Sequence, residues 1–198
     1  MSRFFETVCI KNGIPQYLEW HERRMNLARR EFFGEVRPIL LEEAISLSGA
    51  MLTGVFRCNI HYDEEVKQVS YKKYEKRVIR SLKLVYDPDI DYHLKFTDRS
   101  VLESLFKLRG PFDEVVIVKN GFITDTTVSN LIFLSGNTWF TPATPLLEGT
   151  CRNRLLYEGR ITARNIRVKD LNLFTDCKLI NAMRDPDEES AIPVSAII

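Results

Sequence analysis

The chain has 198 residues, of which 44% are hydrophobic and 28% are charged, and its formal net charge is +1 at pH 7. These values are typical of a globular protein with one large or two small domains. The near-neutral charge gives no electrostatic case for a nucleic acid or an anionic membrane as partner. No apolar run approaches the ~20 residues that are needed to span a bilayer.

The four cysteines, Cys9, Cys58, Cys151 and Cys177, lie far apart and form no CxxC pair. Four cysteines could in principle form two disulfides, but the opening residues MSRFFETVCIKNG lack the long apolar segment of a signal peptide. We therefore expect reduced thiols in a cytoplasmic protein.

The first half of the chain predicts a small α+β domain over residues 1–87. A strand at 4–10 is followed by a turn at 11–13 and a partner strand at 14–18, and a helix covers 18–34 because apolar residues recur at helical intervals up to Gly34. Pro38 opens a second predicted helix that runs to residue 50. Strands are expected at 53–62, 67–74 and 77–86, before the Asp87-Pro88 turn.

Residues 88–198 predict a larger second domain. Thr97 or Asp98 is expected to cap a helix that ends at Gly110, with Val101, Leu102, Leu105, Phe106 and Leu108 as its apolar stripe. Two hairpins follow at 113–124 and 129–142, the former with an Asn120-Gly121 turn. A helix at 149–159, a strand at 160–168, a short helix near 169–174 and strands at 177–183 and 191–198 complete the prediction.

Three polar spots could carry chemistry, although each also has an ordinary explanation. Asp125 ends a strand among hydroxyl residues, which is also typical of a turn. Lys95, between Leu94 and Phe96, could be a partly desolvated nucleophile or a surface lysine at a helix entry. Gly149 precedes a helix and leaves backbone amides that can bind an anion, as many helices do.

The remaining polar features favour ordinary roles. The histidines are isolated and show no zinc spacing, and we interpret His61 as a packing or surface residue. The basic run at 71–83 alternates with aromatic residues, but on strands its charges fall mostly on a solvated face, which is a better account than RNA binding. In contrast, a lysine, a carboxylate and a helix-start anion cup are together what pyridoxal phosphate requires.

Five short motifs in order resemble those of the class IV aminotransferase family, the fold-type IV pyridoxal-phosphate enzymes. HERRM at 21–25 resembles the HxxRL motif, which implies that Arg24 binds the phosphate. KFTDR at 95–99 resembles the segment with the imine-forming lysine, which implies this role for Lys95, and Arg99 keeps the family arginine. DTTVSN at 125–130 is similar to EGxxSN, which implies Asp125 as partner of the ring nitrogen and Asn130 as the asparagine that follows.

The last two motifs complete the implied phosphate site. LEGTCR at 147–152 is similar to LPGITR, which implies that the amides of Thr150 and Cys151 form the phosphate cup. INAM at 180–183 resembles a segment that closes over the phosphate, which implies Asn181 and Ala182 nearby. The resemblance implies an α+β fold, with a small N-terminal α/β domain and a C-terminal pseudo-barrel domain that binds the cofactor. It also implies a homodimer. No metal is expected, because the sequence shows no zinc spacing.

The chain departs from the family pattern at four places. It lacks the strand pair that usually precedes FET, and it has Asp98 for asparagine, Glu148 for proline and Asp125 for glutamate. The side chain of Asp125 is one methylene shorter, so its contact with the ring nitrogen is expected to be direct or through one water.

The resemblance implies a pyridoxal-phosphate-dependent lyase that removes pyruvate from 4-amino-4-deoxychorismate and yields 4-aminobenzoate for folate synthesis. Lys95 takes the proton from the carbon that bears the substrate nitrogen. Thr7, in FFETV, matches a threonine that these lyases carry near the reacting atoms, although FET-like segments also occur in transaminases. The alternatives are a branched-chain or D-amino-acid transaminase and a non-catalytic binding protein on the same fold.

Overall fold

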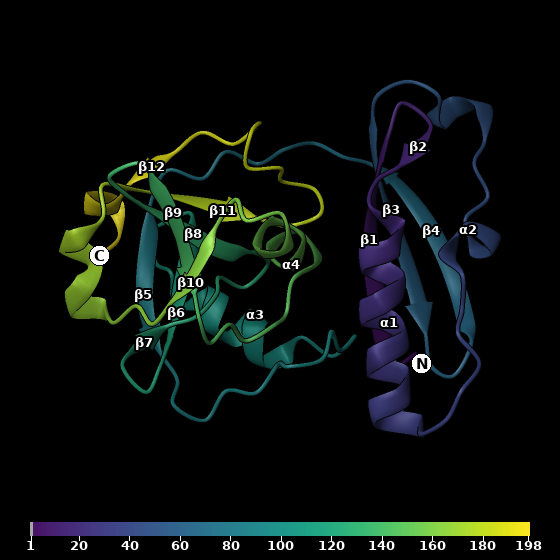
Figure 1. Ribbon diagram of the computed structural model, residues 1–198, viewed down its shortest axis with the longest axis horizontal. Coiled ribbons are helices and arrows are strands. Elements are labelled where there is room, and N and C mark those ends of the chain that lie inside the picture. The colour runs from purple at the N-terminus through teal and green to yellow at the C-terminus, as the bar shows by residue number, and fades with distance from the viewer. Residues whose placement is uncertain (1) are drawn as a thin grey trace. The chain divides into compact units, whose positions relative to one another are not determined.

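The computed structural model describes residues 2–198, apart from the side chain of Ala50 (Figure 1). The chain forms two compact units: unit 1 comprises Met1–Lys76 and Leu94–Asp98, and unit 2 comprises Arg77–His93 and Arg99–Ile198. The division differs from the expected boundary at residue 87. Residues 77–93 belong to unit 2 because they carry a strand of its sheet, and residues 94–98 return to unit 1.

Unit 1 is an antiparallel sheet with a helix against one face (Figure 1). The sheet order is β2-β1-β3-β4. Its strands are β1 (Phe4–Lys11), β2 (Ile14–Pro15), β3 (Val55–Tyr62) and β4 (Val66–Lys73), and its helices are α1 (Leu18–Phe33) and the short α2 (Leu41–Ala44). The predicted helix at 18–34 is confirmed, and Gly34 ends it with a positive φ of 80°.

The core of unit 1 lies between α1 and the sheet. Alternate residues of β1 point toward the helix, so Phe4, Val8 and Ile10 pack with Met25 and Ala28 of α1. Burying such side chains stabilises the fold by about 1.5–3 kcal/mol for each large residue. Glu6 occupies the same core-facing alternation and is completely buried. A carboxylate at a core position requires partners, and these are described below.

Residues 94–98 lie along the edge of β1. The amide of Phe5 donates to the carbonyl of Lys95 at 3.1 Å, the amide of Thr97 donates to the carbonyl of Arg3 at 2.8 Å, and Phe4 and Phe96 form an antiparallel bridge. The position of Lys95 in unit 1 is therefore set by backbone bonds to β1.

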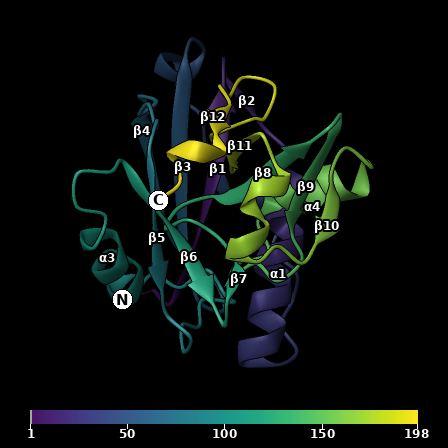
Figure 2. The same cartoon turned by 90° about the vertical axis from the view of Figure 1, so that its left-hand side faces the viewer.

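Unit 2 contains two sheets, which Figure 2 shows in teal and in green to yellow. The three-stranded sheet has the order β5-β6-β7, and the five-stranded sheet has the order β10-β9-β8-β11-β12. The strands are β5 (Leu82–Tyr86), β6 (Glu114–Lys119), β7 (Phe122–Ile123), β8 (Asn130–Ser135), β9 (Thr138–Pro142), β10 (Thr162–Arg164), β11 (Asp176–Ile180) and β12 (Ile192–Pro193). The α-helices are α3 (Ser100–Lys107) and α4 (Thr150–Tyr157).

One apolar core joins the two sheets of unit 2. Leu82, Val116 and Ile123 of the smaller sheet pack with Leu131 and Phe133 of the larger one. The predicted hairpin at 113–124 is confirmed: Asn120 and Gly121 have φ values of 52° and 80°, as a tight turn between twisted strands requires. The hairpin formed by β8 and β9 is confirmed as well.

Several predicted elements were wrong in extent. The helix expected at 38–50 is reduced to the four residues of α2, and the strand expected at 191–198 is reduced to β12 and a 3₁₀ turn at Val194–Ala196. Arg99, and neither Thr97 nor Asp98, stands at the N-cap of α3. Val101 and Leu108 are exposed, so the buried stripe of α3 is narrower than predicted and depends on Leu102 and Leu105.

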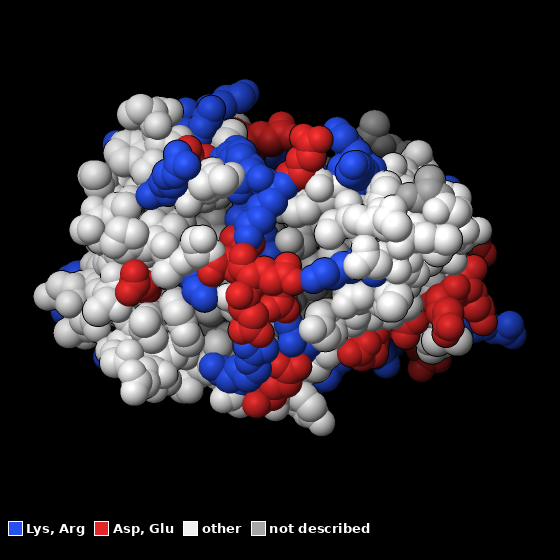
Figure 3. Space-filling view, turned by 90° about the horizontal axis from the view of Figure 1, so that it is seen from above, with Lys and Arg blue, Asp and Glu red and all other residues white. Residues whose placement is uncertain are grey.

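Acidic and basic side chains are interleaved on the face shown in Figure 3. No helix in the described part of the chain is long and apolar enough to cross a membrane. The four cysteines are buried, and none of them forms a disulfide.

Candidate functional site

Asp125 is a buried carboxylate in unit 2 that holds a neighbouring loop. Its Oδ2 accepts hydrogen bonds from the amides of Leu146 and Leu147, both at 2.9 Å, and its Oδ1 accepts one from Asn130 Nδ2 at 2.8 Å. Burial raises the pKa of Asp125 to about 6, while these donors and the charge of Arg152 act in the opposite direction. The carboxyl group can therefore gain or lose a proton near neutral pH.

The hydroxyl residues after Asp125 build a tight turn. The hydroxyl of Thr126 accepts a hydrogen bond from the amide of Ser129 at 3.0 Å, and the amide of Thr126 donates to the carbonyl of Ser129 at 2.9 Å. Thr127 donates its hydroxyl to Glu114 at 2.9 Å, and its carbonyl accepts from Arg99 Nη2 at 2.7 Å. These polar groups satisfy one another and hold the strand end where Asp125 lies.

Asn130 joins the Asp125 turn to the loop before α4. Besides its bond to Asp125, Asn130 Nδ2 donates to the carbonyl of Leu147 at 2.9 Å. Gly149 has an ordinary extended backbone, with φ −66° and ψ 139°, which any residue can adopt, so the backbone conformation does not require a glycine here. A glycine is needed for space, because a Cβ at this position would lie 1.8 Å from Asn130 Oδ1.

Gly149→Ala should therefore disrupt this junction. The added methyl group must displace the Asn130 side chain from Asp125 and Leu147, and we expect a loss of about 1–3 kcal/mol in the free energy of unfolding. Urea unfolding measures this loss. Gly49→Ala is the matched control, because Gly49 has no positive φ and its Cβ would meet no atom within 4 Å. Equal stability of the two variants would contradict the packing argument.

The start of α4 presents backbone amides beside this junction. Gly149 is the N-cap, and the first helical bond runs from the amide of Asn153 to the carbonyl of Gly149 at 2.9 Å. The amides of Thr150 and Cys151 precede that bond and have no acceptor inside the helix, and no side-chain cap is found there among residues 2–198. Burial raises the pKa of the Cys151 thiol to about 11, so this residue offers its amide and not a thiolate.

Asn181 connects the C-terminal loop to the same turn. Its Nδ2 donates to the carbonyl of Val128 at 3.0 Å and to the hydroxyl of Ser129 at 2.9 Å. Backbone bonds between Asn181 and Arg184 close a tight turn with Ala182 and Met183 at its tip. Unit 2 thus brings together Asp125, Asn130, the start of α4 and, through Asn181, the turn that carries Ala182.

Lys95 and Thr7 lie on one face of the sheet of unit 1. The Lys95 ammonium is 4.5 Å from the centroid of the Phe5 ring, and Phe5 and Thr7 share a face because they are two residues apart on β1. Thr7 Oγ1 donates to Asn59 Oδ1 at 3.1 Å. Lys95 is half-buried.

Arg24 faces Glu6, on the other face of β1. Arg24 Nε and Nη2 bind the two carboxylate oxygens of Glu6 at 2.9 and 2.5 Å, and His21 Nδ1 lies 2.7 Å from Glu6 Oε2. Burial lowers the pKa of His21, the Glu6 carboxylate opposes this, and the charges of Arg24 and Lys95 add to the lowering. The imidazole is therefore neutral at pH 7, and the ion pair is formed by Glu6 and Arg24.

Glu6 should make stability depend on pH in the acid range. Burial alone would raise the pKa of Glu6, but the bonds to Arg24 and His21 lower it from 4.5 to about 2. A lowered pKa in the folded state adds stability above pH 4.5 that is lost as the pH falls toward 2. We expect this contribution, about 3 kcal/mol, to be absent from Glu6→Gln. Urea unfolding between pH 2 and 5 measures it, and parallel curves for both proteins would contradict the assignment.

Glu6 and His21 were missed in the sequence. A signal for them exists, since Glu6 is an acid in the core-facing alternation of β1, and His21 and Arg24, three residues apart, share one face of α1. The contact between Asn130 and Gly149 left no such signal, because it joins segments that only the folded chain brings together.

Comparison with known proteins identifies the wider group. The family model for amino-transferase class IV matches residues 64–195. An uncharacterized protein of Haemophilus influenzae (strain ATCC 51907 / DSM 11121 / KW20 / Rd) is 42% identical over 185 residues, which are 92% of this chain and 98% of that protein.

Solved structures share the fold. A crystal structure from Haemophilus somnus 129pt, provisionally named a 4-amino-4-deoxychorismate lyase, is 36% identical with a TM-score of 0.89 and covers 93% of this chain and 98% of its own. A hypothetical aminotransferase from Mycobacterium tuberculosis in its PLP-bound form is 16% identical with a TM-score of 0.77, covering 99% of this chain and 81% of that one; this likeness concerns the fold alone. With a family model that spans most of its length and a mixed α/β fold that matches fold-type IV structures, this chain belongs to the class IV aminotransferase family.

Proposed function

We propose that this protein is a pyridoxal-phosphate-dependent lyase that converts 4-amino-4-deoxychorismate to 4-aminobenzoate and pyruvate. The observation that carries the proposal is the structure from Haemophilus somnus, which has this provisional activity in its name and matches this chain at 36% identity over almost its full length. Thr7, in the FFETV segment, supports the lyase over a transaminase.

The residues in each unit fit the cofactor in chemical kind. In unit 2, the amides at the start of α4 provide donors for a phosphate, and Asp125 provides a buried carboxylate for a ring nitrogen. In unit 1, Lys95 provides the amine for covalent attachment, and Arg24 provides a positive charge whose Nε and Nη2 edge is held by Glu6.

Each residue has a distinct task in the proposed reaction. When bound, pyridoxal phosphate supplies an electron sink for negative charge on the carbon beside the substrate nitrogen. Lys95 Nζ takes the proton from that carbon, and Asp125 maintains a proton on the ring nitrogen. Arg24 and the amides of Thr150 and Cys151 hold the phosphate through charge and hydrogen bonds. Asn130 keeps Asp125 oriented.

The reaction balances without an oxidant. The C–H bond at the carbon bearing the amine and the C–O bond to the enolpyruvyl group break, and the six-membered ring becomes aromatic. The released enolpyruvate takes up a proton and becomes pyruvate. Thr7, on the same face of the sheet as Lys95, offers its hydroxyl near the atom that loses or gains a proton, and Asn59 fixes its orientation.

The test is product analysis with purified protein, pyridoxal phosphate and 4-amino-4-deoxychorismate. We expect 4-aminobenzoate and pyruvate in equal amounts, with Lys95→Ala as the inactive control. Parallel reactions with leucine or D-alanine and 2-oxoglutarate measure transamination. Glutamate formed in those reactions without 4-aminobenzoate in the first would overturn the lyase assignment in favour of a transaminase. A protein that stays colourless with cofactor and gives no product would be a binding protein on the same fold.

A further inference from the structure

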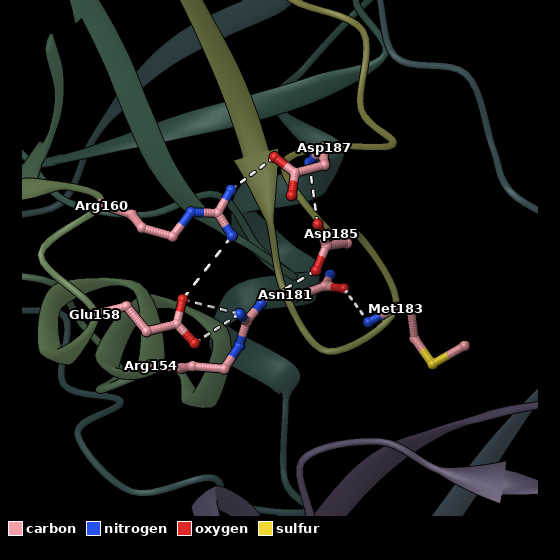
Figure 4. A network of polar contacts seen from close by, with 7 residues as sticks. All are labelled: Arg154, Glu158, Arg160, Asn181, Met183, Asp185 and Asp187. Atoms are coloured by element: carbon pink, nitrogen blue, oxygen red, sulfur yellow. Dashed lines mark hydrogen bonds and ion pairs between the residues drawn. The ribbon is translucent and has the colours of Figure 1, made fainter.

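Two of the attachments of the loop after β11 lie on either side of its tight turn, and Figure 4 shows the one that Asp185 and Asp187 form. On one side, the Asn181 amide binds the turn after Asp125, through Val128 and Ser129. On the other side, Asp185 and Asp187 reach basic residues at α4 and just beyond it. The tight turn at residues 181–184 lies between these attachments, so both restrain it.

Arg154 is the buried member of the second attachment. Its Nη2 lies 3.1 Å from Asp185 Oδ2, and its Nη1 donates to both carboxylate oxygens of Glu158, at 3.0 and 3.1 Å. Only 6% of its side chain is exposed. Cys151, at the start of α4, packs in the same buried cluster as Ile180, which precedes the loop. The bond of Arg154 to Asp185 therefore adds a polar link between α4 and the loop.

We propose that Arg154 is a positioning residue of the anion cup, which holds the 181–185 loop beside the start of α4. The inference rests on the proposed function for the identity of the anion as the cofactor phosphate. Arg154 is buried, and a buried charge that loses its partner is costly, so release of Asp185 is disfavoured. The planar shape of the guanidinium matters, because its two terminal nitrogens bind Asp185 and Glu158 at the same time.

Hydrogen bonds within the turn at residues 181–184 restrain the loop. Asn181 Oδ1 accepts from the amide of Met183 at 2.8 Å, and the amide of Arg184 donates to the carbonyl of Asn181 at 3.0 Å. Asp185 follows this turn directly, so its bond to Arg154 fixes the loop one residue beyond the closing pair. Loss of the Arg154–Asp185 bond should make the turn at residues 181–184 more mobile. It should also weaken the hydrogen bonds from Asn181 to Val128 and Ser129.

The neighbouring pair Arg160–Asp187 provides a matched control. It joins the same loop at 2.6 Å, but 39% of the Arg160 side chain and 70% of the Asp187 side chain are exposed. Exposed ion pairs contribute little, because water and salt screen them. Arg160→Met should therefore leave the loop in place.

The experiment uses the full chain and the variants Arg154→Met, Asp185→Ala, both together, and Arg160→Met. Hydrogen exchange of the cofactor-free proteins measures protection at Met183 and Arg184, and absorbance titration with pyridoxal phosphate measures its dissociation constant. We expect protection to fall and the dissociation constant to rise about tenfold in the first two variants. The double variant should match the single variants, because each single substitution already removes the Arg154–Asp185 bond. Arg160→Met should resemble the wild type.

The two readouts separate the possible failures. Unchanged protection in Arg154→Met and Asp185→Ala would overturn the positioning role, as would an equal effect of Arg160→Met. Failure of the wild type to bind pyridoxal phosphate would count against the proposed function instead. If Arg154→Met does not fold, Asp185→Ala decides the result, since the Asp185 side chain is 30% exposed and its removal leaves Arg154 bound to Glu158.

Discussion

Replacing Lys95 with alanine should lower turnover by about 10²–10⁴-fold. The substitution removes both the amine that attaches the cofactor and the base that takes the substrate proton. The backbone bond from Phe5 to the carbonyl of residue 95 remains, so the edge of β1 should stay intact. Steady-state formation of 4-aminobenzoate measures turnover, and the yellow colour of the covalently attached cofactor measures attachment.

Lys107→Ala is the control for Lys95→Ala. Lys107 is an exposed lysine at the end of α3, so its loss changes net charge equally and should leave both readouts unchanged. If Lys95→Ala kept the turnover and the colour of the wild type, another lysine would hold the cofactor and the assignment would be wrong.

Asp125→Asn should lower turnover by about 10²-fold or more while the cofactor remains bound. The substitution keeps the size of the side chain but removes the negative charge that supports a proton on the ring nitrogen. Arg24, Lys95 and the α4 amides do not depend on that charge, so cofactor occupancy should change little. The measurements are turnover at saturating cofactor and cofactor content after desalting.

Asp113→Asn is the matched control for Asp125→Asn. Both carboxylates accept hydrogen bonds from two backbone amides, those of Arg80 and Ser81 in the case of Asp113. A structural effect of weakening such backbone bonds should therefore appear in both variants, whereas a loss of turnover confined to Asp125→Asn supports the ring-nitrogen role. Full turnover of Asp125→Asn would make Asp125 a turn acid, and Asp98 would be the next candidate.

Sequence patterns predicted the elements that depend on residues close together in the chain. The Asn120-Gly121 hairpin, α1 with its Gly34 end, and the glycine before α4 were all visible in the sequence, because turn chemistry and helical spacing act over a few residues. The helix expected at 38–50 was wrong in extent, because local patterns do not determine it alone. Pro38 and the helix-favouring residues after it indicate a helix, but only Leu41–Ala44 forms one in the fold.

The polar contacts of the candidate site could be predicted only in part. The sequence picked out Asp125 and its hydroxyl neighbours, and the structure shows that the hydroxyls form a turn while Asp125 also binds the loop at 146–147. The partnership of Glu6 with Arg24 joins residues on a strand and a helix, so no local pattern shows that they meet. The assigned catalytic and cofactor-binding roles remain predictions.

Reductive trapping shows directly which lysine attaches the cofactor. Wild-type protein is incubated with pyridoxal phosphate, treated with borohydride, digested and examined by peptide mass spectrometry. We expect one modified lysine, Lys95, in the peptide that contains LKFTDR, and no modification when the cofactor is omitted. Modification of a different lysine, or none at any cofactor concentration, would contradict this expectation.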